Sequence, residues 1–259
     1  MDENKGKKTA LLYDGSGAYP SGVVAWGQVL RARGYDVVKA SGDVFTQKLS
    51  ANPDLVAIPG GHSAKYNEDL GRDGIATISS YVQNGGTLLA VCGGAYFLSE
   101  DISFKMLERD GSVTLKDKKG IGLIAARSFN VAAYDDYGSS SAQFATLRMG
   151  ADYLHAYYNG GPRYEFYSKN QMFPFLFFED GAEAGVQIKV GRGRVIALSV
   201  HPEYSMKALP EELQKLHPAQ EKLRAQMRGV KSDHDMILDQ IFTRINFVQI
   251  PVAERRHAR

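Results

Sequence analysis

The chain has 259 residues, of which 44% are hydrophobic and 23% charged, with a formal net charge of +2 and a single cysteine. This composition is ordinary for a soluble globular protein of one large domain or two small ones, and the charge is too small to indicate nucleic-acid binding. One cysteine excludes an internal disulfide and a cysteine-rich metal site, and no apolar run is long enough to span a membrane.

Strand and helix patterns alternate through the first hundred residues. Apolar residues at helical spacing predict helices over 23–33 and 75–82, and short apolar runs predict strands at 9–13, 35–39, 55–58 and 87–91. This alternation favours an α/β fold in which helices cover both faces of a mostly parallel sheet. Ligands of such sheets bind at the carboxyl ends of the strands. Because Pro59-Gly60-Gly61 and Cys92 both follow a predicted strand, we expect them to share one crevice.

The middle of the chain is less regular and reads mainly as strands. The patterns predict strand-like structure over 120–133, a loop to residue 141, strands on either side of a turn at 159–162, and a core strand over 173–178. Two apolar runs flank Gly191-Arg192-Gly193 and predict a hairpin over 185–200.

From residue 211 the composition changes to Leu, Lys, Gln, Glu and Arg, which indicates helices. Apolar residues such as Ile237, Leu238 and Ile241 predict a stripe that packs on the main domain, with a partner-binding helix as the alternative. We therefore expect a main domain over 1–204 and a C-terminal helical extension over 205–259.

Cys92 lies between a buried strand and the small residues Gly93, Gly94 and Ala95. A strand, a sharp turn and a helix in this order resemble a nucleophile elbow, where small neighbours leave room for the reactive side chain. The following helix would point its positive end at the sulfur and favour the thiolate. The alternative is that Cys92 is a small buried hydrophobic residue.

The end of the second hairpin strand carries His201-Pro202-Glu203. Pro202 favours an extended backbone at His201, and in an extended chain residues two apart project to the same side. The Glu203 carboxylate can then orient the imidazole of His201, which can take the proton of the Cys92 thiol. The sequence therefore predicts a nucleophile, a base and an orienting carboxylate.

Several stretches, in this order, resemble the class I glutamine amidotransferase family, and more closely the amidotransferase-like domain at the N-terminus of biotin-protein ligases. Together they span residues 9–204. They are Leu12-Tyr13-Asp14-Gly15, Ile58-Pro59-Gly60-Gly61, Cys92-Gly93-Gly94-Ala95-Tyr96, Tyr157-Tyr158-Asn159-Gly160-Gly161-Pro162 and His201-Pro202-Glu203.

The resemblance implies a flavodoxin-like doubly wound sheet and a thiol amidohydrolase. It places the oxyanion hole at backbone N–H groups near Gly61 and Gly93, beside Gly60. His62 directly follows the turn at Gly61 and is a candidate to contact the substrate. The resemblance suggests that Tyr96 and Asn159 also line the crevice. Glutamine-using members carry Gln where this chain has Tyr96, so we expect a small-molecule or peptide amide other than free glutamine as substrate.

Three further expectations complete this interpretation. No metal or other cofactor, membrane or nucleic acid is expected to take part, and cytoplasmic location is the default because the polar first residues lack a signal-peptide core. A non-catalytic binding or regulatory module on the same fold is the main alternative, since fold does not fix function. A homo-oligomer, or an ammonia-supplying subunit that works with a separate synthetase, also stays open.

Overall fold

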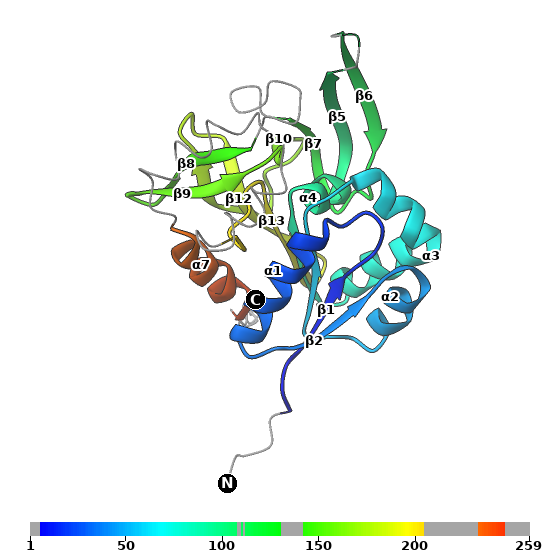
Figure 1. Cartoon of the computed structure of the whole chain (residues 1–259). Helices are drawn as coiled ribbons and strands as arrows, with labels where there is room; N and C mark the ends of the chain where they lie inside the picture. The colour runs from blue at the N-terminus through cyan, green and yellow to red at the C-terminus, as the bar shows by residue number, and fades with distance from the viewer. Residues whose placement is uncertain (1–5, 108–109, 111, 131–141, 205–232, 247–259) are drawn as a thin grey trace, which may run out of the picture.

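The computed structural model describes residues 6–107, 110, 112–130, 142–204 and 233–246. It shows an α/β fold with one large mixed sheet and one small sheet (Figure 1). The large sheet has nine strands in the order β2-β1-β3-β4-β13-β12-β11-β8-β9.

One half of the large sheet is parallel and the other half is antiparallel. The parallel pairs join β2 (Asp36–Ala40), β1 (Thr9–Tyr13), β3 (Leu55–Ile58), β4 (Thr87–Val91) and β13 (Gly193–Leu198). The antiparallel pairs join β13 to β12 (Glu183–Val190), β11 (Met172–Phe178), β8 (Gln143–Met149) and β9 (Asp152–Tyr158). The prediction of a mostly parallel sheet is therefore wrong for the second half, because short hairpin connections return the chain antiparallel.

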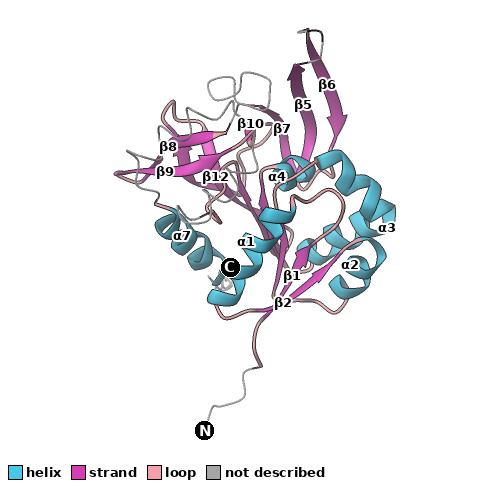
Figure 2. Ribbon diagram, viewed as in Figure 1, coloured by secondary structure: helices cyan, strands magenta, loops and turns pink. Residues whose placement is uncertain are grey.

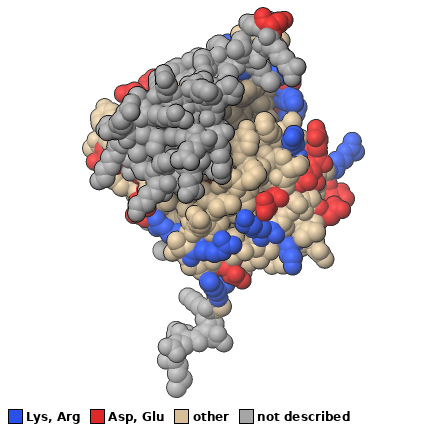
Figure 3. Space-filling view, in the orientation of Figure 1, with Lys and Arg blue, Asp and Glu red and all other residues tan. Residues whose placement is uncertain are grey.

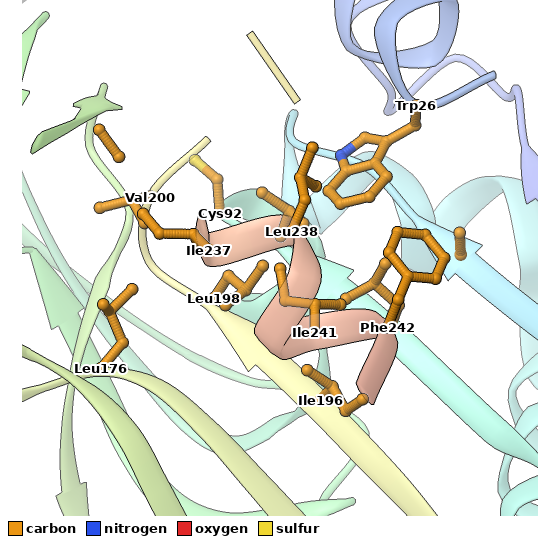
Figure 4. Packing of buried hydrophobic residues seen from close by; sticks show 14 of the residues in the cluster. Trp26, Cys92, Leu176, Ile196, Leu198, Val200, Ile237, Leu238, Ile241 and Phe242 are labelled. Atoms are coloured by element: carbon orange, nitrogen blue, oxygen red, sulfur yellow. The ribbon is translucent and has the colours of Figure 1, made fainter. Parts of the chain in front are cut away.

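Helices cover both faces of the sheet, as the alternating pattern predicts. One apolar cluster holds side chains of α1 (Pro20–Ala32) and α7 (His234–Asn246), and a second holds side chains of α2 (Gly42–Leu49), α3 (Ser63–Gln83) and α4 (Gly93–Leu98). The α7 side chains Ile237, Leu238, Ile241 and Phe242 face the sheet and Trp26, and Cys92 lies at the border of this cluster (Figure 4). The predicted apolar stripe of this helix is thus confirmed.

The small sheet has four strands in the order β10-β7-β5-β6. They are β10 (Pro162–Phe166), β7 (Ile124–Asn130), β5 (Ser99–Leu107) and β6 (Val113–Lys119). β5 and β6 form a two-stranded ribbon that projects from the body of the molecule (Figure 2). β5 begins directly after α4, so the small sheet is built onto the end of the helix that follows Cys92.

Most of the predicted strands are confirmed within a few residues at each end. The predicted hairpin is formed by β12 and β13, whereas β9 and β10, predicted on either side of one turn, belong to different sheets. The predicted loop over 134–141 and the helices predicted over 211–232 lie outside the described residues. The boundary predicted at residue 204 stays a prediction for the same reason.

The surface and the helices give two further observations. Basic and acidic side chains lie intermixed over the described part of the face in Figure 3. Among the residues that the structure describes, no helix combines the length and the apolar character needed to cross a membrane.

Candidate active site

Cys92 occupies a sharp turn between β4 and α4. Its backbone has φ 50° and ψ −111°, a conformation with positive φ that residues other than glycine rarely adopt. Its amide N–H donates to the carbonyl oxygen of Leu198 at 2.8 Å, which ties the turn to the end of β13. The side chain is buried, with 6% of the residue exposed. Backbone strain held in this way is often found at functional sites.

His201 and Glu203 follow β13, the neighbour of β4, and their side chains are buried. The imidazole Nδ1 lies 2.8 Å from Oε1 of Glu203. The backbone N–H of His201 donates to the carbonyl oxygen of Tyr157 at 2.7 Å, which fixes the position of the histidine. A carboxylate on Nδ1 orients the ring and leaves Nε2 as the nitrogen available to a second partner.

The charge of His201 depends on its two polar neighbours. Burial disfavours the imidazolium and lowers the pKa of His201, but the charge of Glu203, then the charge of Cys92 and hydrogen bonds with both residues, raise that pKa to about 10. A hydrogen bond thus joins the imidazole to the carboxylate, and the thiol lies close enough to the imidazole to raise the pKa of His201. The three side chains predicted from the sequence are brought together.

The glycine turn after β3 is pressed against these side chains. A Cβ added to Gly60 would lie 2.7 Å from Cε1 of His201 and 3.4 Å from Cβ of Cys92. A Cβ added to Gly93 would lie 1.9 Å from the carbonyl oxygen of Gly61. Among the described residues, no hydrogen-bond acceptor pairs with the amide N–H of Gly61 or Gly93. Two uncommitted backbone donors therefore lie beside Cys92.

The segment between β9 and β10 covers the sulfur. Sγ of Cys92 lies 3.5 Å from the carbonyl oxygen of Asn159. The segment is held by the hydroxyl of Tyr158, which donates to the carbonyl oxygen of Gly161 at 2.8 Å. The contact to Cys92 is thus made by the backbone of Asn159, which no side-chain pattern could have indicated.

The other two predicted contact residues lie differently. His62 is exposed, and its Nε2 lies 3.4 Å from the hydroxyl oxygen of Tyr19. The ring of Tyr96 is buried and packs edge-on against Phe104 of β5, with 5.7 Å between the ring centroids. Tyr96 therefore contributes to the packing between α4 and the small sheet.

Two tyrosines near the thiol, Tyr19 and Tyr66, were not predicted from the sequence. Burial raises the pKa of both Tyr19 and Tyr66, and the charge of Cys92 raises it further. The Tyr66 hydroxyl donates to the carbonyl oxygen of Pro59 at 2.8 Å and so supports the glycine turn. In the sequence, each tyrosine follows a glycine turn by a few residues, and this is the signal that could have indicated them.

The fold places the chain among proteins with a class I glutamine amidotransferase-like fold. A glutamine amidotransferase from Thermotoga maritima superposes with a TM-score of 0.55 and 9% identity, over 93% of this chain and 100% of that one. At this identity the likeness concerns the fold alone. The family is narrower: the chain belongs to the family described as biotin-protein ligase, N terminal, which matches residues 8–257.

Two relatives are similar to this chain in sequence. A biotin–protein ligase of Schizosaccharomyces pombe is 30% identical over 171 residues, which are 62% of this chain and 27% of the ligase. An uncharacterised protein of Chlamydia muridarum is 33% identical over 167 residues, which are 61% of each. The chain thus spans about a quarter of one relative and about three fifths of the other.

Proposed function

We propose that this protein is a cysteine hydrolase that cleaves an amide bond of a small molecule or peptide. The observation that carries the proposal is that Nδ1 of His201 lies 2.8 Å from Oε1 of Glu203 while the thiol of Cys92, a residue with positive φ, lies close enough to raise the pKa of the ring. This order of groups is the one that activates a thiol in cysteine-based hydrolysis. The family, and the likeness of the fold to an amidotransferase, support the same conclusion.

The reaction runs in two steps at these groups. The Cys92 thiol gives its proton to Nε2 of His201, and the thiolate attacks the acyl carbon, whose oxygen becomes negative. The N–H groups of Gly61 and Gly93 stabilise that oxygen, and one such donor elsewhere contributes about 3 kcal/mol to the transition state. His201 returns the proton to the leaving amine. Water then attacks the thioester, again with His201 as base, and releases the acid and the free thiol.

The substrate differs from free glutamine in this proposal. The position that carries Gln in glutamine-using members holds Tyr96, whose ring packs against Phe104 inside the protein. The buried phenol side chain of Tyr96 has no amide group with which to bind a substrate, as a Gln side chain would have. The parallel strands have the order β2-β1-β3-β4-β13, as in a flavodoxin-like sheet, whose ligands bind at the carboxyl ends of the strands. This supports a site at the ends of β4 and β13.

A second candidate function is a binding module without turnover. One observation favours it: the thiol is nearly closed off, since Cys92 is 6% exposed and His201 is 4% exposed. A closed site can hold a ligand after local opening without performing chemistry on it.

Hydrolysis of a panel of amides, short peptides and γ-glutamyl compounds separates the two functions. We expect release of ammonia or amine from at least one class, and loss of that release in Cys92→Ser and in His201→Ala. His155→Ala is the matched control, because His155 lies in β9 and its side chain contacts Asp233. Binding of a panel member without turnover, or turnover that persists in Cys92→Ser, would contradict the hydrolase.

A further inference from the structure

Two partners of the Cys92 thiol favour opposite charge states. The Asn159 carbonyl oxygen, 3.5 Å from Sγ, only accepts hydrogen bonds and therefore needs the S–H proton. The nearby ring of His201 attracts the sulfur most strongly once that proton has moved to the ring, because the thiolate then faces an imidazolium. A thiolate in this place would face the negative end of the carbonyl dipole. The carbonyl of Asn159 thus stabilises the thiol and opposes its ionisation.

The segment around Asn159, from the end of β9 to β10, contacts the rest of the site on both sides of that residue, at Tyr157 and at Gly161. The carbonyl oxygen of Tyr157 accepts the backbone N–H of His201 at 2.7 Å. A Cβ added to Gly161 would lie 1.8 Å from the carbonyl oxygen of Ser199, so the two backbones are in direct contact. Lifting the whole segment would break these contacts and disturb His201. A change that relieves the conflict at the sulfur must therefore be local.

The peptide between Asn159 and Gly160 has the means for such a local change. Gly160 has φ 72°, in the left-handed region. Glycine populates positive and negative φ about equally well, so half a turn of this one peptide plane costs no side-chain clash at residue 160. That rotation turns the carbonyl away from the sulfur and brings the N–H of Gly160 toward it.

We propose that the Asn159–Gly160 peptide has two positions, one with the carbonyl on the thiol and one with the Gly160 N–H donating to the thiolate. The proposal rests on the proposed function, because it describes how the nucleophile of that site is activated. As the peptide turns, the S–H proton passes to Nε2 of His201, so that a thiol and an imidazole become a thiolate and an imidazolium. The raised pKa of His201 belongs to this second state, because the charge of Cys92 is one of its causes. The Gly160 amide then acts as a further donor of the active site.

Gly160→Ala tests the two positions because a Cβ penalises positive φ. A penalty of roughly 1–2 kcal/mol for left-handed backbone corresponds to about a five- to thirtyfold shift toward the position with negative φ. Cys92 is the one cysteine of the chain, so the rate of alkylation by iodoacetamide, followed by mass spectrometry, reports on this thiol alone. We expect the midpoint of the alkylation rate between about pH 5 and about pH 10 to fall by about one pH unit in Gly160→Ala.

Gly150→Ala is the matched control. Gly150 also has positive φ, at 63°, and no atom lies within 4 Å of an added Cβ. It stands between β8 and β9, away from the sulfur, so its midpoint should equal that of the unchanged protein. Thermal unfolding of both variants verifies that each is folded at the temperature of the assay.

The tyrosines near the sulfur do not titrate over most of the range from about pH 5 to about pH 10 used in the alkylation experiment. The groups that the charge of Cys92 reaches are His201, which is paired with Glu203, and the hydroxyls of Tyr19, Tyr66 and Tyr164. Burial is the first cause that raises the pKa of all three tyrosines, and the charge of Cys92 adds to it. They therefore remain neutral through most of the range, and His201 is the group that exchanges a proton with the thiol.

Each outcome separates this inference from the proposed function. A faster alkylation of Gly160→Ala at every pH with an unmoved midpoint means greater access only, and overturns the two-position peptide. If His201→Ala leaves the profile of the unchanged protein as it was, the proposed function itself fails. A midpoint that falls in Gly160→Ala and rises in His201→Ala supports both.

Discussion

Two glycine pairs lie near Cys92, and they contribute different polar groups to its surroundings. In Gly60-Gly61, after β3, the Gly61 N–H has no acceptor among the described residues, and an added Cβ at either glycine would meet a neighbouring atom. Gly160-Gly161, between β9 and β10, follows a carbonyl oxygen that lies 3.5 Å from the sulfur. The same dipeptide thus supplies a donor in one place and sits next to an acceptor in the other.

The difference lies in what surrounds each pair. Gly61 packs against the backbone of the loop after β1, and Gly60 packs against the imidazole of His201, so the first pair has one conformation. In the second pair, Gly161 is locked against Ser199 while Gly160 has φ 72°. A Gly-Gly motif near a nucleophile therefore does not by itself indicate an oxyanion hole; the packing around each glycine decides its role.

The largest expected effect concerns the rigidity of the first pair. In Gly61→Ala the new Cβ would lie 1.9 Å from the carbonyl oxygen of Gly17 at φ 156°, and neither backbone can yield cheaply. We expect a loss of at least about 3 kcal/mol in the free energy of unfolding, measured by urea denaturation. In Gly22→Ala, within α1, the nearest atom is 3.6 Å away, and a gain of about 0.5 to 1 kcal/mol is expected. Equal stability of the two variants would show that the first pair is not rigid.

A second variant tests the link between the first pair and the imidazole. The Cβ of Gly60→Ala would lie 2.7 Å from Cε1 of His201, so the ring must move away from the thiol. Misplacing a base by such an amount costs on the order of a hundredfold in rate. We expect alkylation of Cys92 at neutral pH to slow by at least about tenfold, while far-ultraviolet circular dichroism stays unchanged. An unaltered rate would remove the imidazole from the activation of the thiol.

The third prediction concerns pH. Burial lowers the pKa of His201, yet Glu203 and Cys92 raise it from 6.5 to about 10 in the folded protein. Because the folded value lies above the unfolded one, the stabilisation is complete below about pH 6.5 and is lost as pH rises toward 10. We expect the unfolding free energy to fall by about 3 kcal/mol more between about pH 6 and about pH 9 than it does in His201→Gln. Parallel pH profiles of the two proteins would contradict the shifted pKa.

The smallest effect concerns the flank of the second pair. Tyr158→Phe removes the hydroxyl that donates to the carbonyl oxygen of Gly161 at 2.8 Å. We expect a loss of about 1 kcal/mol in thermal or urea unfolding. Tyr164→Phe is the matched control, because the buried Tyr164 hydroxyl has no partner among the described residues, so its removal should leave stability unchanged or raise it. If Tyr164→Phe loses as much stability as Tyr158→Phe, the hydrogen bond from Tyr158 to Gly161 does not contribute to the free energy of unfolding.

The parallel half of the sheet could be predicted because its strands are short buried runs that end in glycine turns. The runs ending at Tyr13, Ile58 and Val91 became β1, β3 and β4 with the expected ends. The short α2 escaped prediction because its buried residues are Phe45 and Leu49, too few for a clear helical period.

The small sheet could not be predicted because its strands carry little apolar pattern. Every described side chain of β6 except Thr114 is exposed, so no alternation marks the strand. Alternation of apolar and polar residues does not show which strands pair. The sequence therefore suggested that β9 and β10 are partners, whereas they lie in different sheets. Cys92, His201 and Glu203 were predicted because side-chain chemistry identifies them. The Asn159 carbonyl was missed because every residue has one.

Because β4 and β13 are neighbours in the sheet, the chain between them can change with limited effect on their pairing. These adjacent strands deliver the thiol and the imidazole, and the hydrogen bond from the Cys92 amide to Leu198 fixes their relative height. About a hundred residues of chain, 92–192, separate the two strands, including the projecting ribbon and the segment that contacts the sulfur. Changing the length of that excursion outside residues 157–161, which contact Cys92, His201 and Ser199, would alter which molecules reach the thiol without changing the register of β4 and β13. Access to the thiol and the placement of its base therefore depend on different stretches of the chain.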